Sequence, residues 1–410
     1  MSRADTADPV VITGVGLVSP LGVDREHSWE GVSSGRAAAR LMPVDDGLPP
    51  VSGVHHSLPG WIGCPAVQGG NAADDRVLAL GRRATREALS DARIGPGNLD
   101  PTRVGCVFGT SKGSLFAASA AWLSSSDNRP FAASWPSAVA SAIGAEQGWE
   151  GPSLAPIAAC ATGLVAVIRA AQLLREGACD VVLAGSADDS LHPLVLASFQ
   201  RLGVLARHSD PARASRPFDR GRNGFVIGAG AGALVLERRS HAAARGASWY
   251  AALGPGRYAA DPSGMTTLDP TGRTLARLLS EAIPTGRRPH YLNLHGTGTR
   301  LNDPAECRAA RLVGLGACRA GSLKGGLGHL LGAAGSVELG LLCLAIRDQR
   351  LPPNVNLDDV DPECDLPWIG PNAEAARVDS ILKVSLGFGG HQAALWLERC
   401  RGPGDRTRTA

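Results

Sequence analysis

Short apolar, β-branched segments alternate with segments of helical period along most of the 410 residues. In the first half we expect strands at 10–13, 104–108 and 181–184, and helices over 74–92 and 160–176. Such alternation is typical of layered α/β folds, in which helices cover the faces of a sheet. The pattern therefore predicts an α/β architecture for the whole chain.

The second half follows the same logic. It predicts helices over residues 272–282, 304–312 and 329–347, and strands at 291–294, 382–385 and 393–398. Residues 153–159 are expected to be extended, 225–236 to form one long or two short strands, and 322–326 a short strand or turn. Each half carries a reactive side chain, Cys160 or His329, at the expected start of a helix. This indicates a duplicated domain with one site between the halves.

The best internal boundary is the polar stretch 240–248, which divides the chain into units 1–245 and 246–410. Residues 36–75 are rich in glycine, proline and polar residues and are interpreted as a surface excursion. Residues 110–150 show no clear period. The tail 401–410 has the polar composition of a disordered segment.

Composition and charge exclude several classes of protein. The 41 basic and 38 acidic residues nearly balance, which is unlike a dedicated nucleic-acid binder. Nine cysteines without a CxxC pair argue against a disulfide framework or a zinc ribbon. No uncharged apolar run reaches the ~18 residues of a membrane span, and the N-terminus lacks the apolar core of a signal peptide. We therefore expect a cytoplasmic protein.

Cys160 is the first candidate for chemistry. It stands in the segment IAACATGL, with small residues on both sides and a long apolar helix after it. At a helix N-terminus the macrodipole favours the thiolate, so a lowered pKa is expected. A buried structural cysteine is the alternative interpretation, and Cys160 alone does not exclude it.

Two histidines strengthen the case for catalysis. His295 follows an apolar strand in the segment NLHGTGT, where threonine hydroxyls could bind a long polar ligand arm. His329 ends the segment KGGLGH, which begins with Lys324, one of only three lysines in the chain. Glu338 is a charged residue on an otherwise apolar helix, and buried charges are expected in pairs. We therefore expect a Lys324–Glu338 ion pair.

Other sites are disfavoured. A metal site built from Cys160, His295 and His329 would lack any short-range ligand pair. The GAGAG run at 228–232 lies within an apolar strand-like segment without a following helix, unlike a dinucleotide loop. Neither a GxxxxGK[ST] phosphate loop nor a GxSxG nucleophile elbow occurs.

Six motifs, in the same order along the chain, make it resemble the β-ketoacyl-acyl carrier protein synthases, the condensing enzymes of fatty-acid and polyketide synthesis. The motifs are VVITGVGLVSPLG, AACATGLVAVIRAAQLLREGACDVVLAGSADD, SRPFDRGRNGFVIGAGAGALVLE, HGTGTRLNDPAE, KGGLGHLLGAAGSVELG and SLGFGG. The likeness is greatest to the elongating Cys-His-His branch shared by type II fatty-acid and polyketide ketosynthases. It implies a thiolase fold, with two duplicated βαβαβαββ halves in five layers (α-β-α-β-α), and a dimer.

The resemblance also implies residue roles. Cys160 would be the nucleophile that accepts the acyl chain, and His295 and His329 would promote decarboxylation of the extender and stabilise its enolate. Lys324, paired with Glu338, would hold this arrangement.

Further residues would support the site. The N–H groups of Cys160 and Phe388 would form the oxyanion hole, and the Phe388 ring would gate the pocket. Thr297 and Thr299 would bind the pantetheine arm. The carboxylates of Asp303 and Glu306 would stabilise the His295 loop.

The implied activity is an acyltransferase of the 3-oxoacyl-[acyl carrier protein] synthase type. It would carry out the decarboxylative Claisen condensation of an acyl thioester with malonyl-acyl carrier protein, in a type II polyketide (specialised metabolite) or fatty-acid pathway. No metal, nucleotide or flavin is implied, because the substrates are carried on the phosphopantetheine of acyl carrier protein. Two alternatives remain: a non-catalytic, chain-length-factor-like partner subunit, which usually lacks the cysteine, and a ketosynthase-like acyltransferase, which usually lacks one histidine.

The implied partners are acyl carrier protein and a second subunit, in a homodimer or in a heterodimer with a chain-length-factor-like chain. Neither nucleic acid nor a membrane is expected as a partner. Carrier proteins are acidic, so arginines near the pocket should steer them. Arg207, Arg213 and Arg216 are candidates, although internal ion pairs would explain them equally well.

The chain departs from the family pattern at several positions near the expected pocket. Ala158 replaces a common threonine, His391 and Gln392 replace the usual Thr-Asn, and Ala229 and Asn223 each replace an acidic residue. These departures concern the substrate more than the chemistry. They favour a ketosynthase of specialised metabolism.

Overall fold

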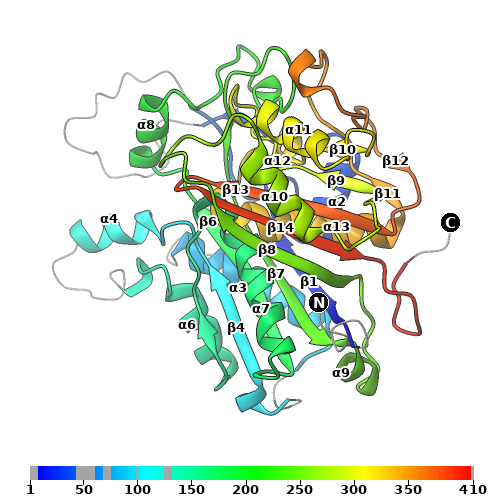
Figure 1. Cartoon of the computed structure of the whole chain (residues 1–410). Helices are drawn as coiled ribbons and strands as arrows, with labels where there is room; N and C mark the ends of the chain where they lie inside the picture. The colour runs from blue at the N-terminus through cyan, green and yellow to red at the C-terminus, as the bar shows by residue number, and fades with distance from the viewer. Residues whose placement is uncertain are drawn as a thin grey trace.

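The computed structural model describes residues 8–42, 61–67, 75–95, 97, 99–123 and 132–407. Much of the predicted surface excursion, at 43–60 and 68–74, lies outside the described residues. The structure is built on one 12-stranded sheet that curves through the molecule, with helices on its faces (Figure 1).

The first half of the sheet has the spatial order β5-β4-β6-β7-β1. Strands β5, β4 and β6 are parallel, and β7 and β1 continue the sheet in antiparallel fashion. The bounds are β1 Val10–Val18, β4 Val104–Gly109, β5 Ser153–Leu154, β6 Val181–Asp189 and β7 Ile227–Arg238.

The second half has the order β10-β9-β13-β14-β8. Counted along the chain, both halves therefore follow the order third, second, fourth, fifth, first. Strands β10, β9 and β13 are parallel, and β14 and β8 antiparallel, as in the first half. The bounds are β8 Ala252–Ala260, β9 Tyr291–Asn293, β10 Ala320–Gly321, β13 Ser380–Gly387 and β14 His391–Glu398.

The two halves join where β1 pairs with β8 over two residue pairs. Beside this path, β2 Arg40–Leu41 pairs with β3 Ile62–Cys64, and β3 pairs with β7, whereas β11 Arg350–Leu351 and β12 Glu374–Ala375 form a separate two-stranded sheet. The repeated strand order agrees with the duplicated thiolase fold that the resemblance implies. The boundary at residue 245 stays a prediction; helix α9, Arg239–Ala244, ends just before it.

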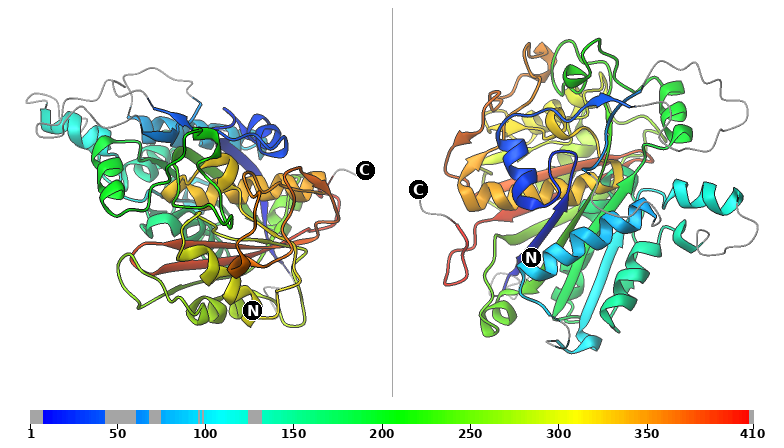
Figure 2. Two further views of the ribbon diagram at one scale, coloured as in Figure 1. Left: turned by 90° about the horizontal axis from the view of Figure 1, so that it is seen from above. Right: turned by 180° about the vertical axis from the view of Figure 1, so that it is seen from behind.

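Helices complete five layers. Helices α3 (Arg76–Asp91) and α6 (Ala138–Gln147) cover the outer face of the first half, and α10 (Arg273–Ala282) and α11 (Asn302–Leu312) cover the second (Figures 1 and 2). Helices α7 (Thr162–Arg175) and α13 (Ala334–Asp348) lie between the halves and contact strands of both. Further helices in the described part of the chain include α2 Arg25–Ser33, α4 Leu115–Leu123, α8 Pro193–Arg201 and α12 Lys324–Leu327.

Small residues allow the two central helices to meet. A Cβ on Gly163 of α7 would lie only 2.5 Å from the Ser336 nitrogen of α13, and a Cβ on Gly335 would clash with the Leu164 nitrogen. The backbones therefore touch where the helices begin, and side chains larger than hydrogen would force them apart. This contact brings the N-terminal turns of α7 and α13 together.

Several expectations about single elements are wrong. Strand β8 was not expected, because its Gly254-Pro255-Gly256 sequence is typical of a turn; the structure accommodates the proline at a bulge opposite Trp396. The run expected to be extended at 153–159 forms a strand at Ser153–Leu154 and ends in a 3-10 turn at Ala159, and residues 324–326 lie in the four-residue helix α12, where a short strand or turn was expected.

Residues 401–407 of the tail, which the sequence predicts to be disordered, make specific contacts with the first half. Arg406 pairs with Asp91 at 2.6 Å and also donates to the hydroxyl of Tyr250, while the Trp249 N–H donates to the carbonyl of Gly404. These contacts fix the tail against the first half. Within the described residues, no helix is both long and apolar enough to cross a membrane.

Candidate active site

Parallel strands end at a common edge of a sheet, and ligands in α/β proteins bind beyond that carboxyl edge. Cys160 follows β5, His295 follows β9, His329 follows β10, and Phe388 follows β13. The structure gathers these four residues around one cavity of about 150 Å³, which Thr297 and Thr299 also line. Residues of both halves therefore meet at a single site.

Cys160 lies in a single 3-10 turn, Ala159–Ala161, immediately before α7. Ala159 in front of it has φ +46°, an unfavourable region for a residue with a Cβ, and such strain is characteristic of functional turns. The backbone N–H of Phe388 donates to the Cys160 sulfur. Gly387 permits this approach, because a Cβ there would lie 2.7 Å from the Ala158 oxygen and 3.0 Å from the Cys160 nitrogen.

The expected lowering of the Cys160 pKa is wrong for the unliganded site. Burial raises the pKa of the thiol to about 12, and the charges of Lys112 and Lys324 offset only part of this effect. The helix dipole lies behind a 3-10 turn here and does not outweigh the loss of hydration. Without a bound substrate, Cys160 is therefore a neutral thiol, and its ionisation requires neighbouring groups that stabilise the thiolate.

Two buried carboxylates hold the loop that carries His295. Glu306 accepts the N–H groups of His295 and Gly296 at 2.6 and 2.7 Å, and Asp303 accepts those of Thr297 and Gly298 at 3.1 Å. Both carboxylates come from the first turns of α11. Burial raises the pKa of Glu306 to about 7, although the two N–H donors favour its charged form.

Asn302, which the sequence did not single out, joins the two carboxylates. Its side-chain amide donates to Asp303 at 3.1 Å and to Glu306 at 2.7 Å. Asn302 directly precedes Asp303 in the sequence. This neighbourhood was the only sequence signal that Asn302 belongs to the site.

His329 does not open a helix, contrary to expectation. It lies in a connection between α12 and a 3-10 turn, Leu331–Ala333, and α13 begins only at Ala334. Gly328 before it has φ +70° and Leu331 after it φ +46°, and these left-handed residues interrupt the helix. The main chain of His329 instead forms a parallel bridge with Ile227 of β7; its N–H donates to the Val226 carbonyl at 2.7 Å, and its carbonyl accepts the Gly228 N–H at 2.9 Å.

The two imidazoles lie edge to face, with ring centroids 5.0 Å apart. Burial, reinforced by the charge of Lys324, holds the pKa of both histidines well below 6.5. Both rings are therefore neutral at physiological pH, and a neutral imidazole has one N–H to donate. Their Nδ1 atoms have no hydrogen-bond partner among the described residues.

The expected Lys324–Glu338 ion pair is present, with Nζ and Oε1 2.7 Å apart. Lys324 also donates to the carbonyl oxygen of His295 at 2.6 Å, so the pair fixes the histidine loop. Lys383, which sequence reasoning missed as part of the site, binds the second oxygen of Glu338 at 2.5 Å. Burial lowers the pKa of Lys383 to about 8, and the two lysines together keep the pKa of Glu338 low despite its burial.

Two threonines and the hydrogen-bonded turn that carries Phe388 form the mouth of the cavity. The hydroxyls of Thr297 and Thr299 lie 3.1 Å apart, where either could bind a polar ligand. The turn that carries Phe388 is held by Gln392, whose amide donates to Asp261 at 3.2 Å. Gln392, a departure from the family pattern, thus joins two segments of the mouth, and His391 lines the same opening.

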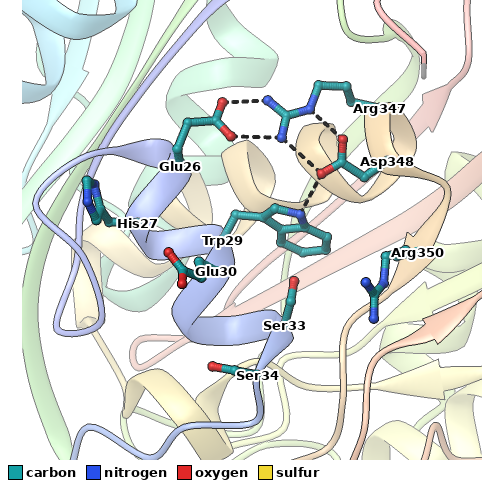
Figure 3. Close-up of a pocket in the computed structure, with 9 residues that line it drawn as sticks. All are labelled: Glu26, His27, Trp29, Glu30, Ser33, Ser34, Arg347, Asp348 and Arg350. Atoms are coloured by element: carbon teal, nitrogen blue, oxygen red, sulfur yellow. Dashed lines mark hydrogen bonds and ion pairs between the residues drawn. The ribbon is translucent and has the colours of Figure 1, made fainter.

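A second, more open cavity of about 510 Å³ lies between α2 and the end of α13 (Figure 3). Its wall is an ion-pair network: Arg347 binds both oxygens of Glu26 and also Asp348, which accepts the indole N–H of Trp29. It shares no residue with the Cys160 cavity. Among the described residues, no group of three His, Cys, Asp or Glu side chains could hold a metal ion.

The candidate arginines divide into two groups. Arg213 and Arg216 both contact Asp358, at 2.5 and 3.4 Å, so their guanidinium groups make ion pairs within the chain. The main chain of Arg207 is bonded to the side chain of Asn223, another departure from the family pattern. Steering of a carrier protein by Arg207 stays a prediction.

The arrangement suits acyl transfer followed by carbanion chemistry. A thiol can attack a thioester carbonyl whose oxygen is received by two backbone N–H groups. Two neutral imidazoles at the same cavity can donate to a developing enolate oxygen.

Known proteins resemble the chain over nearly its whole length. The models of the N-terminal and C-terminal domains of beta-ketoacyl synthases match residues 7–242 and 255–358. The ketoacyl synthase alpha subunit of the tetracenomycin polyketide synthase of Streptomyces glaucescens is 36% identical, over 95% of this chain and 97% of its own.

Two solved structures are similar as well. A type II polyketide synthase acyl carrier protein in complex with its ketosynthase, bound to the hexaketide, has a TM-score of 0.86 at 28% identity and covers 95% of this chain and 99% of its own. The ishigamide ketosynthase/chain length factor has a TM-score of 0.84 at 27% identity, over 96% and 100%. These likenesses confirm the expected thiolase fold.

Proposed function

Because this chain belongs to the β-ketoacyl synthase family, we propose that it carries out decarboxylative condensation on Cys160, in the cavity that this residue shares with His295 and His329. The observation that carries the proposal is the meeting of Cys160, His295 and His329 at one cavity, with the Phe388 N–H directed at the sulfur. The chain is an acyl-transferring synthase of the ketosynthase type.

In the first step, the Cys160 sulfur attacks the thioester carbonyl of an acyl group on carrier-bound phosphopantetheine. The N–H groups of Cys160 and Phe388 receive the oxyanion. The carrier thiol then leaves with the proton that Cys160 loses, and the acyl group remains as a thioester. Thr297 and Thr299 bind the pantetheine arm at the cavity mouth.

In the second step, a malonyl thioester occupies the same mouth and loses CO₂. The electron pair of the broken carbon–carbon bond forms an enolate, whose oxygen accepts hydrogen bonds from His295 and His329. The enolate carbon attacks the acyl carbonyl on Cys160 and expels the thiolate, which takes a proton from solvent. The products are a β-ketoacyl thioester, CO₂ and the free thiol.

This step predicts an unusual pH profile. The depressed pKa values of His295 and His329 keep both rings neutral, so decarboxylation of malonyl thioester should not lose rate between about pH 7.5 and about pH 6. CO₂ release measured across this range checks the prediction. A decline centred on the ordinary histidine pKa that persists in Glu306→Gln, which removes the titration of Glu306 near pH 7, would contradict it.

The same pKa values affect stability with a definite sign. Below the unfolded-state pKa of 6.5, the unfolded chain binds more protons than the folded one. The contribution of these histidines to stability is therefore complete above that pH and falls as the pH decreases towards their folded-state pKa values.

The partner of this chemistry is an acyl carrier protein, and the chain works as a homodimer or with a chain-length-factor-like subunit in the cytoplasm. Similar structures that contain a carrier protein or a chain length factor support these two partners. A purely non-catalytic role is not favoured, because Cys160 and both histidines are kept.

Product formation tests the proposal. The protein is incubated with an acyl-carrier thioester and malonyl-carrier thioester, alone and with a chain-length-factor-like partner, and the carrier is analysed by mass spectrometry. A β-ketoacyl product is expected from wild type and not from Cys160→Ala. Equal product with both proteins would show that Cys160 is not the nucleophile.

A further inference from the structure

The repeated strand order identifies equivalent positions in the two halves. Strand β4 of the first half corresponds to β9 of the second, so the loop after Gly109 corresponds to the loop after Asn293. The second of these loops carries His295, and the first carries Lys112. Because β4, β5 and β6 are parallel, Lys112, Cys160 and Asp188 all lie at the carboxyl edge of the first half.

Lys112 is held in a compact polar cluster. Its ammonium donates to the hydroxyls of Ser111 and Ser190, each at 2.5 Å, and lies 3.6 Å from Asp188. Asp188 is buried and also accepts the Ser190 hydroxyl. The cation is therefore fixed in place, as a flexible surface lysine would not be.

Asp188 also connects the cluster to the turn after His329. Its Oδ2 accepts the N–H of Ser111 and the N–H of Gly332, both at 3.2 Å. A Cβ on Gly332 would lie 2.5 Å from the Ser111 nitrogen, so the two loops touch directly. The 3-10 turn with Gly332 packs in turn on the 3-10 turn with Cys160.

The positions of the three lysines also relate Lys112 to the active site. Only three of the 41 basic residues are lysines. Lys324 and Lys383 share Glu338 behind the histidines. Lys112 comes from the other half, and its charge, like that of Lys324, lowers the pKa of the Cys160 thiol.

We propose that Lys112 and Asp188 are positioning residues for Cys160: the Lys112 cation stabilises the thiolate, and Asp188 anchors Lys112 while opposing its field at the sulfur. The inference rests on the proposed function of Cys160 as nucleophile. It gives the thiolate, needed in attack and formed again when the acyl group leaves, a compensating charge within an apolar site.

Other polar and charged groups also lie around Cys160 and affect its thiol. His295 and His329 line its cavity as neutral rings, and Lys324 lies behind them with its charge paired to Glu338. The Phe388 N–H bonds to the sulfur itself. None of these groups changes in the variants below, so a change in thiol reactivity reports the Lys112–Asp188 pair.

Alkylation by iodoacetamide is the test. The reagent is neutral, so Lys112 does not steer it, and well below the thiol pKa its rate is proportional to the thiolate fraction. The experiment uses a Cys318→Ser background, because Cys318 is the other cysteine that is not fully buried, and Cys160→Ala gives the blank. Rates are measured from about pH 7 to about pH 9.

Lys112→Met is expected to slow alkylation about three- to tenfold, since one pKa unit changes the thiolate fraction tenfold and the thiolate's nucleophilicity partly compensates. Lys112→Arg should restore most of the rate. Asp188→Asn keeps an oxygen acceptor and should speed alkylation, because it removes the opposing charge.

An unchanged rate in Lys112→Met overturns the proposal, and so does a change of the same sign in both variants. A thermal melt checks that each variant is folded. If Asp188→Asn does not fold, the comparison of the alkylation rates of Lys112→Met and Lys112→Arg tests the proposal. Acyl loading is measured separately. Alkylation that responds as expected without acyl loading would contradict the proposed function and leave this inference standing.

Discussion

A His329→Ala variant is expected to lose decarboxylation of malonyl thioester by about 10²–10³-fold while still taking an acyl group onto Cys160. The imidazole of His329 lies edge to face with His295 and faces the cavity, where it can donate to the enolate oxygen. Acyl transfer uses the backbone N–H groups of Cys160 and Phe388, which the substitution leaves in place. CO₂ release and acyl loading, measured separately, give the two rates.

The matched control is His192→Ala. His192 is also buried, but it caps α8, contacts Ser119 and does not line the Cys160 cavity. This variant should retain decarboxylation. If His329→Ala kept decarboxylation, or lost acyl loading to the same extent, the assigned role of His329 would be wrong.

The second large effect is on stability. Glu338→Leu should lower the free energy of unfolding by about 3–5 kcal/mol, because it leaves two buried ammonium groups without a counter-charge. Glu338 is the ion-pair partner of both Lys324 and Lys383, and all three side chains are almost completely buried. The midpoint of urea unfolding measures the loss.

Two further variants separate charge from packing. Lys383→Met keeps the Lys324–Glu338 pair and should cost much less than Glu338→Leu. Replacing all three residues, with methionine at both lysines and leucine at Glu338, should recover most of the stability. If Glu338→Leu does not fold, Glu338→Gln provides a milder comparison; a Glu338→Gln protein as stable as wild type would contradict the account.

Much of the site could be predicted because its residues sit at strand ends in distinctive segments. Cys160, His295 and His329 each stand beside small residues, and such residues leave room for a ligand. Glu338 could be paired with Lys324 because a single acid on an apolar helix needs a partner. The α/β class followed from the alternation of two periodicities.

Other features depend on contacts that are distant in the sequence. Lys383 lies in an apolar strand, and its partner Glu338 is 45 residues away. The thiol pKa depends on how completely the two halves bury Cys160, and burial outweighed the helix dipole. The start of α13 was misplaced because Leu331, an ordinary helix former, is held at φ +46° by its surroundings.

The most direct test of the central claim is the intact mass of the protein after incubation with a panel of acyl-carrier thioesters, with Cys160→Ala and Cys318→Ser beside wild type. We predict a gain of one acyl group in wild type and in Cys318→Ser, and no gain in Cys160→Ala. The donors that load fastest would then define the acyl chains that the cavity accepts. An acyl group retained in Cys160→Ala, or no loading of wild type by any donor even with a chain-length-factor-like partner present, would contradict the assignment of Cys160 as the nucleophile.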